Sequence, residues 1–162
     1  MTPEVKQWIA DARGKYIPTP VGRVLEIGAL DVNGQVRDLF PDAALYVGVD
    51  VIAGRNVDTV LNGHDLLSHF GPCAFDLVLC LETLEHDPEF WLTLQAIRTV
   101  LRHGGLACIS VPGNGFPEHH GPDYWRFLPD VQHVLFDGLQ LLAFEQRAHR
   151  IYTELIGIAR RP

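Results

Sequence analysis

Short apolar runs alternate along this chain with amphipathic or turn-rich segments, and the pattern predicts strands and helices in turn. The apolar runs that predict strands cover residues 24–27, 44–50, 57–61, 75–81, 106–111, 139–145 and 153–159. Strands that alternate with helices are typical of a mainly parallel sheet. No helix is predicted between the last two strands, so we expect them to form an antiparallel pair at the sheet edge.

Amphipathic spacing and turn residues predict the helices. They are expected at residues 3–12, about 35–40, near 66–70, after Asp87 and at 129–136. The helix after Asp87 has the clearest boundaries, because Asp87 is a good N-cap, Pro88 suits the first helical position, and Gly104 or Gly105 ends it. The fold expected from this order is α/β, with residues 1–162 forming one domain and residues 1–20 an N-terminal helix and Pro-containing connector.

Composition excludes several classes of protein. The chain of 162 residues is 47% apolar and 20% charged, which is ordinary globular material. Its formal charge of −7 makes a broad grip on nucleic-acid phosphates unlikely to be its function. No apolar run approaches the roughly 18 residues of a membrane span, and the first residues lack the apolar core of a signal peptide. We therefore expect a cytoplasmic protein with no membrane partner.

Three cysteines, Cys73, Cys80 and Cys108, lie in or beside apolar runs and have no CxxC spacing. A metal set or a disulfide framework would need closer or paired spacing. We expect small core residues or free thiols, and no metal site.

The stretch VLEIGALDVNG, residues 24–34, reads as a buried strand that ends at a glycine and a turn. In an open α/β sheet, a nucleotide-like ligand sits beyond the carboxyl end of the first strand. Gly28 would let the backbone approach such a ligand, and the helix expected after Gly34 would present free N–H groups to it. Glu26, a carboxylate inside an apolar strand, needs either an internal partner or a ligand.

An acid follows the second predicted strand. Asp50 lies about 20 residues after Gly28, where an acid accepts hydrogen bonds from ribose hydroxyls. The alternative is a solvated loop acid.

Four segments follow one another along the chain, and their order carries information about the family: VLEIG, YVGVD, FDLVLCLETLEH and VLRHGGLACISVPG. With them the sequence resembles the class I S-adenosylmethionine-dependent methyltransferases over residues 21–160. The resemblance implies a Rossmann-like three-layer sandwich around a seven-strand, mainly parallel sheet, with S-adenosylmethionine as cofactor and methyl transfer as the reaction. Two alternatives stay open: a catalytically silent methyltransferase-like binding module, and another nucleotide-cofactor enzyme such as an NAD-dependent dehydrogenase.

The resemblance also implies a set of cofactor-binding residues. These are Glu26, Gly28, Ala29, Leu30, Asp50, Val51, Asp65, Leu66, Leu81 and Glu82. Glu26 would lie at the methionine end, Asp50 at the ribose and Val51 against the adenine. Asp65 would accept from the adenine amino group, although it reads equally well as an N-cap. Leu81 and Glu82 would line the methionine and sulfonium region, where carboxylates suit the positive sulfur.

The glycine loop departs from the family pattern. Many members carry glycines where this chain has Leu30 and Val32. Either the loop takes another path, turning at Asn33-Gly34 with Asp31 near the donor's amino group, or cofactor binding has weakened. We favour another path, because Asn-Gly supplies a tight turn and the other landmarks are intact. A subset of bacterial family members looks similar in having a D-V-N-G loop.

A second informative segment, NGFPEHHGPDYWRF at residues 114–127, follows the fifth predicted strand. His119 and His120, together with His86 of the LEH segment, are the candidate general bases. His86 could equally make a structural hydrogen bond. Adjacent histidines in a strand-like segment point to opposite sides, which argues against joint metal chelation. Tyr124 and Arg126 are candidates for substrate binding, or they pin the loop onto the sheet.

The expected acceptor is a small molecule or a glycan-related compound with a hydroxyl or amine group. After strand 75–81 the chain has LETLEH, and the N/D-P-P-Y/F signature of amino-methylating nucleic-acid enzymes does not occur there. No insertion is large enough for a substrate domain. The acceptor would therefore bind in an open cleft, or in a cleft completed by a homodimer or another partner subunit.

Overall fold

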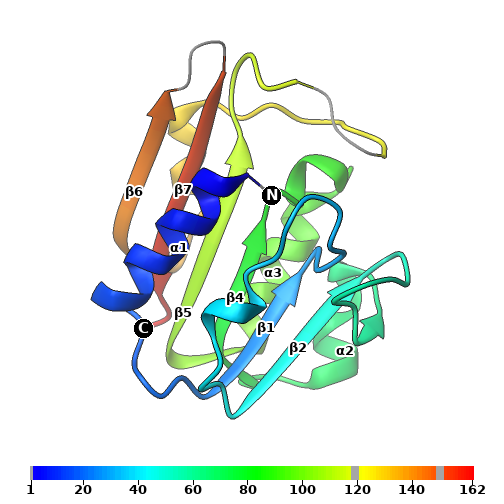
Figure 1. Cartoon of the computed structure of the whole chain (residues 1–162), viewed down its shortest axis with the longest axis vertical. Helices are drawn as coiled ribbons and strands as arrows, with labels where there is room; N and C mark the ends of the chain where they lie inside the picture. Colours follow the sequence, from blue (N-terminus) through cyan, green and yellow to red (C-terminus); the bar gives the residue numbers. More distant parts are fainter. Residues whose placement is uncertain (1, 118–120, 149–151) are drawn as a thin grey trace.

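The structure is a computed structural model that describes residues 2–117, 121–148 and 152–162. Seven strands form one sheet in the order β3-β2-β1-β4-β5-β7-β6 (Figure 1). The strands are β1 (Arg23–Ile27), β2 (Leu45–Asp50), β3 (Thr59–Val60), β4 (Phe75–Leu81), β5 (Leu101–Pro112), β6 (Gln140–Ala148) and β7 (Thr153–Arg160). Only β7 runs antiparallel to its neighbours, β5 and β6. The predicted fold class is confirmed.

Helices cover both faces of this sheet (Figure 1). One face carries α1 (Pro3–Lys15), and the other carries α2 (Leu66–Phe70), α3 (Phe90–Val100) and α4 (Gln132–Leu135). Strand β4 shows why both faces are needed, because its side chains alternate between two apolar cores. Leu77 and Leu79 pack in the core that contains the buried face of α1, whereas Val78 and Cys80 pack in the core that contains α2 and α3.

The predicted helix at residues 35–40 is wrong. This segment holds only a 3-10 turn, η1 (Arg37–Leu39). Pro41 follows directly and disfavours helical geometry at Phe40, whose φ and ψ are −124° and 53°. No helix N-terminus therefore follows the glycine loop, and Val36 and Phe40 instead pack into the core beneath α1.

The predicted boundaries of the helix after Asp87 are also corrected. A 3-10 turn, η3 (Leu84–His86), comes first, α3 begins at Phe90 with Glu89 at its N-cap position, and the helix ends at Val100. Gly104 lies within β5 instead of ending the helix. Arg161 explains the early end, because its guanidinium donates to the carbonyl oxygens of Thr99 and Leu101.

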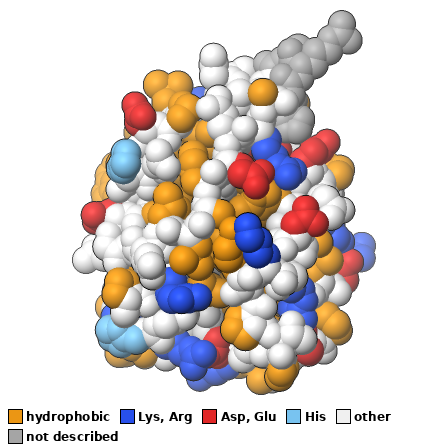
Figure 2. Space-filling model, turned by 90° about the vertical axis from the view of Figure 1, so that its left-hand side faces the viewer, with side chains coloured by type: hydrophobic (Ala, Val, Ile, Leu, Met, Phe, Trp, Pro, Cys, Tyr) orange, Lys and Arg blue, Asp and Glu red, His pale blue; other side chains and the backbone are white. Residues whose placement is uncertain are grey.

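Strand β6 forms one edge of the sheet, and Figure 2 views the molecule from that side. Hydrophobic side chains there are interrupted by charged groups. On β6 itself, exposed Leu141 is followed by Glu145 and Arg147, which pair with each other at 3.3 Å. Charged side chains of this kind discourage strand-to-strand association at an open edge.

The cysteines agree with the prediction, since all three are free thiols and Cys80 and Cys108 are buried in the core. Among the described residues, no helix combines the length and apolar character needed to cross a membrane.

Candidate active site

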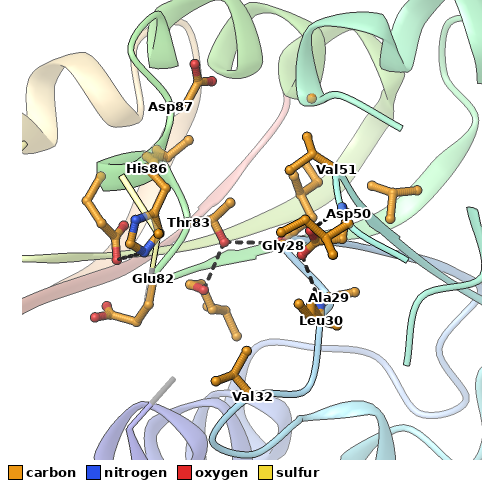
Figure 3. Close-up of a pocket in the computed structure, with 18 of the residues that line it drawn as sticks. Gly28, Ala29, Leu30, Val32, Asp50, Val51, Glu82, Thr83, His86 and Asp87 are labelled. Atoms are coloured by element: carbon orange, nitrogen blue, oxygen red, sulfur yellow. Dashed lines mark hydrogen bonds and ion pairs between the residues drawn. The ribbon is translucent and has the colours of Figure 1, made fainter. Parts of the chain in front are cut away.

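A cavity of about 450 Å³ opens at the carboxyl ends of β1, β2 and β4. Figure 3 shows its two walls. The β1–β2 wall consists of residues 26–30, 32–34 and 49–52, and the β4 wall of residues 81–88. Thr2, the N-cap of α1, and Phe116, from the segment after β5, also line it. Its size and its place at the switch point of an α/β sheet are typical of a small-molecule site.

Gly28 joins the two walls. Its φ of +73° is one that glycine adopts without strain, and a Cβ at this position would lie 2.1 Å from Oγ1 of Thr83. The Thr83 hydroxyl donates to the carbonyl oxygens of Leu81 at 3.0 Å and Ile27 at 3.2 Å. The space that the missing side chain leaves is therefore occupied by Thr83 of the β4 wall.

The buried carboxylate of Glu26 has internal hydrogen-bond partners, and Glu26 also belongs to the cavity lining. Its Oε2 accepts from the Tyr46 hydroxyl at 2.8 Å and from Asn56 Nδ2 at 2.9 Å, so the internal hydrogen bonds are present. The residue also lines the cavity. Burial raises the pKa of this carboxyl, and the two hydrogen bonds partly oppose the shift.

Asp50 ends β2 beside the glycine loop. Its Oδ2 accepts the Leu30 N–H at 3.1 Å, and its Oδ1 accepts the Ile52 N–H at 3.0 Å. A carboxylate accepts about four hydrogen bonds in all, so lone pairs remain for a ligand. Val51 and Ile52, which follow, are 63% and 60% exposed and offer apolar surface at the cavity rim.

The loop from Gly28 to Gly34 is held by its own chain. The N–H groups of Gly28 and Ala29 both donate to the Val49 carbonyl, at 2.9 and 3.0 Å. Leu30 packs against Gly54, where a Cβ would meet its Cδ1 at 2.3 Å. Because these N–H groups already have acceptors, they do not form a free anion cradle.

Asp31 does not reach the cavity. It pairs with Arg55 at 3.2 Å and accepts the Gly34 N–H at 3.0 Å, and it is absent from the cavity lining. Gly34, at the end of this loop, has a φ of +124°. The acid of this loop therefore pairs with Arg55 and not with a group of the cavity lining.

On the β4 wall, Glu82 has a left-handed backbone, with a φ of +50°, that is costly for a residue with a side chain. Ser110 holds it in place: the Glu82 N–H donates to the Ser110 carbonyl at 3.1 Å, and the Ser110 hydroxyl donates to Glu82 Oε1 at 2.9 Å. Burial and the charge of Glu154 raise the pKa of Glu82 to about 7.

Glu85 is the most deeply buried acid of this wall, with 2% of its surface exposed. Its Oε2 has no hydrogen-bond partner among the described residues. Burial and the charge of Glu82 raise its pKa well above the ordinary value. Its backbone carbonyl accepts the N–H of Tyr124 at 2.8 Å, which ties this wall to the segment after β5.

His86 and Asp87 fasten the wall to its neighbours. His86 Nδ1 donates to the Pro122 carbonyl at 2.6 Å, so the structural hydrogen bond is present, and its Nε2 lies 3.6 Å from Glu85 Oε1. The Asp87 carboxylate accepts from His64 Nε2 at 3.0 Å and from the Thr93 hydroxyl at 2.7 Å. These contacts hold β4, α3 and the segment after β3 together around the cavity.

Several residues predicted for the site lie elsewhere. Asp65 is exposed and Leu66 is buried in the core, and neither lines the cavity. Strand β3 ends at Val60, so Leu61, Asn62 and Gly63 reach the cavity instead.

The predicted substrate-binding residues Tyr124 and Arg126 also lie outside the cavity lining. The Arg126 guanidinium donates to both carboxylate oxygens of Asp123, at 2.5 and 2.6 Å, and to the Phe116 carbonyl at 3.1 Å. Arg126 therefore stabilises the loop in which it lies. Tyr124 is exposed, and neither it nor Arg126 lines the cavity. His119 and His120 lie outside the described residues.

Some lining or supporting residues were missed. The sequence assigns no role to Thr83 within LETLEH, and Ser110 lies in a strand pattern that does not indicate its partner. Asn56 carries the rare φ of +72° and bridges Glu26 to the Ala29 carbonyl. Only Thr83 had a usable signal, because it directly follows a predicted strand end.

The cavity is acidic. Among its described lining residues there is no lysine or arginine, and the acids are Glu26, Asp50, Glu82, Glu85 and Asp87. Low-dielectric walls that carry one sign of charge favour ligands of the opposite sign.

Comparison with known proteins identifies this arrangement. A family model described as a methyltransferase domain matches residues 25–109, more than half of the chain. The chain belongs to this methyltransferase domain family. Its sheet order and antiparallel β7 are those of the class I S-adenosylmethionine-dependent methyltransferase fold.

Solved methyltransferase structures share the fold at low identity. The 1,6-didemethyltoxoflavin N1-methyltransferase of Burkholderia thailandensis, solved with 1,6-didemethyltoxoflavin and S-adenosylhomocysteine, is 20% identical with a TM-score of 0.72, covering 98% of this chain and 77% of that chain. The N-methyltransferase NodS of Bradyrhizobium japonicum is 16% identical with a TM-score of 0.71, covering 98% and 95%.

The fold is not restricted to methyl transfer. The cyclase SpnF is 15% identical with a TM-score of 0.75, covering 98% of this chain and 80% of its own. No curated protein matches the sequence.

Proposed function

We propose that this protein binds S-adenosylmethionine in the acidic cavity and transfers its methyl group to a small-molecule acceptor. The observation that carries the proposal is the charge of the cavity: five lining acids and, among the described lining residues, no lysine or arginine. S-adenosylmethionine carries positive charge on its sulfur and on its amino group, so it suits such walls.

The β1–β2 wall would hold the nucleoside. Asp50 keeps lone pairs for the ribose hydroxyls, while its contacts with Leu30 and Ile52 fix the carboxylate in place. Exposed Val51 and Ile52 would pack against the adenine, with Leu61 to Gly63 on the other side in place of Asp65 and Leu66.

The methionine portion would extend toward the β4 wall. Glu26, Gly28, Ala29 and Leu30 would lie along it, with Leu81 and Glu82 near the sulfonium. Because the loop N–H groups are already bonded, the carboxylate tail would depend on other donors. The Thr2 hydroxyl is one such donor, since it lines the cavity and can donate its own hydrogen while it accepts the Val5 N–H at 3.2 Å.

When bound, the donor supplies a methyl group that leaves with its bonding electron pair remaining on sulfur. The protein's part is to align the acceptor with that bond and to exclude water, and alignment alone can contribute about 7 kcal/mol or more to the lowering of a barrier. A hydroxyl or amine acceptor would enter beside Glu82 and Phe116. A second copy of the chain completing the cleft is part of the proposal.

A binding protein without methyl transfer is the second candidate. It is favoured by the internally bonded N–H groups of Gly28 and Ala29 and by the missing helix after Gly34. A dehydrogenase is disfavoured by the family match.

Calorimetric titration with S-adenosylhomocysteine tests the donor site. We expect binding that Asp50→Ala weakens by about tenfold or more, because hydrogen bonds to a charged group are lost. Asp65→Ala is the matched control, an exposed acid outside the cavity, and should leave affinity unchanged. No binding at high micromolar ligand would contradict the proposal. Binding without methyl transfer to any amine or alcohol tested would favour the second candidate.

A further inference from the structure

The β4 wall contains one buried carboxyl group, that of Glu85, whose hydrogen bonding is incomplete. Glu85 lines the cavity, is 2% exposed, and has no partner for Oε2 among the described residues. Its neighbours differ in this respect. Glu82 accepts from Ser110, and Asp87 accepts from His64 and Thr93. Among the acids of the β4 wall, Glu85 alone has a buried side-chain oxygen without a hydrogen-bond partner in the described part of the chain.

The groups around Glu85 offset its charge only in part: His86 Nε2 lies 3.6 Å from its Oε1. Glu82 and Asp123 both disfavour its ionised form, and Glu154 in turn disfavours that of Glu82. Arg126 is engaged with both oxygens of Asp123, and His86 directs Nδ1 to the Pro122 carbonyl. A buried carboxyl oxygen without a hydrogen-bond partner costs free energy that a proton or a bound cation relieves.

The surroundings fit an organic cation better than a bare one. Phe116 and Pro122 also line the cavity, so apolar and aromatic surface lies close to the acids. Aromatic rings and carboxylates together bind ammonium groups that carry hydrocarbon. Anionic acceptors, such as carboxylates and phosphates, would meet repulsion from Glu82 and Glu85.

We propose that the methyl acceptor is a primary or secondary amine that enters as its ammonium ion, bound between Glu85 and Glu82 beside Phe116. This inference rests on the proposed methyltransferase function and narrows its acceptor class.

The ammonium ion gives one proton to the Glu82 carboxylate, which leaves a neutral amine and a carboxylic acid. The nitrogen lone pair then forms the new N–C bond to the methyl group as the C–S bond breaks, and that bonding pair stays on sulfur. The products are a methylated ammonium ion and the neutral thioether S-adenosylhomocysteine. A base with a pKa near the working pH suits the first step, and burial together with Glu154 gives Glu82 such a pKa, about 7.

Three probes of matched shape test the charge preference: benzylamine, benzyl alcohol and benzoate, each titrated calorimetrically into the protein saturated with S-adenosylhomocysteine. We expect benzylamine to bind at least about tenfold more tightly than benzyl alcohol, and benzoate not to bind. Glu85→Gln, which keeps the shape and removes the charge, should remove most of the preference for benzylamine and leave the affinity for S-adenosylhomocysteine unchanged.

Controls separate the possible failures. Glu89→Gln replaces an exposed acid outside the cavity and should change nothing. If Glu85→Gln does not fold, judged by thermal melting, Glu82→Gln serves the same comparison. Equal affinity for benzylamine and benzyl alcohol would overturn the inference while leaving the methyltransferase proposal intact. Failure to bind S-adenosylhomocysteine would overturn both.

A metal would be an alternative occupant. Titration with MgCl2 and with ZnCl2 should show no binding that Glu85→Gln abolishes. Micromolar binding of either ion, lost in Glu85→Gln, would overturn the inference and assign the carboxyl groups to a cation of another class.

Discussion

The two walls of the cavity differ in how far their polar groups are satisfied. On the β1–β2 wall, the N–H groups of Gly28, Ala29 and Leu30 all have acceptors, and both oxygens of Asp50 accept a backbone hydrogen bond. On the β4 wall, Glu85 lacks a partner for Oε2 and lies near other acids. On the first wall, these polar groups therefore have hydrogen-bond partners before any ligand binds. The second carries an electrostatic cost that a ligand can relieve, which makes it the better guide to acceptor chemistry.

The junction between the walls should be the most sensitive point. Gly28→Ala would place a methyl group against Thr83 at a positive φ, and we expect the free energy of unfolding to fall by about 3 kcal/mol. Urea denaturation measures this. Gly34→Ala is the matched control, since its φ is also positive but nothing lies within 4 Å.

The control should lose about 1 kcal/mol, through backbone strain alone. The double variant Gly28→Ala with Thr83→Ala should recover part of the loss. Equal effects at Gly28 and Gly34 would show that contact with Thr83 is unimportant, and the walls would then be less closely joined than the structure indicates.

The second largest effect is expected for the ion pair between Arg126 and Asp123, next to the β4 wall. Arg126→Ala leaves the Asp123 carboxylate, whose side chain is 7% exposed, without its guanidinium, and we expect a loss of about 2 kcal/mol in the free energy of unfolding. Asp123→Asn with Arg126→Ala should cost less than Arg126→Ala alone. Affinity for S-adenosylhomocysteine should not change. A large fall in acceptor affinity with unchanged stability would instead restore Arg126 as a substrate contact.

The pH dependence of stability tests the β4 wall without any ligand. The folded pKa of Glu82, about 7, lies above its ordinary value of 4.5. The native state therefore holds the proton more tightly, and this contribution to stability is complete below about pH 4.5 and is lost as the pH rises through about 7. Relative to Glu82→Gln, the wild-type protein should lose about 1.4 kcal/mol between about pH 6 and pH 8.

Urea denaturation at both pH values measures this difference. Glu89→Gln, an exposed acid, should track the wild-type protein at each pH. A wild-type protein that gains stability over Glu82→Gln as the pH rises would mean that a cation near Glu82 compensates its charge.

The smallest effect is expected on the β1–β2 wall. Tyr46→Phe removes one of the two hydrogen bonds to Glu26 Oε2 and leaves that of Asn56, so we expect a loss of about 1 kcal/mol in stability. Glu26→Gln should weaken S-adenosylhomocysteine binding more than Tyr46→Phe does. Equal effects on binding would mean that Glu26 acts only through its internal hydrogen bonds.

The sequence predicted best where one local pattern decides the structure. The nearly all-apolar segment of β4 indicated a strand that is buried on both faces, and its bounds are confirmed. The helix expected at residues 35–40 failed because Pro41 limits the segment to one turn. Asp65 and Leu66 do not line the cavity, because β3 ends at Val60 and residues 61–63 reach the cavity instead.

The order of strands and helices, the antiparallel last pair and the family all follow from the sequence alone, because periodicity, glycines and landmark segments are local signals. Which side chains share the cavity was decided only in the tertiary structure. Thr83 filling the space at Gly28, Arg126 turning to Asp123 and Glu85 left without a partner each depend on where separate segments meet, and no spacing in the chain encodes those distances.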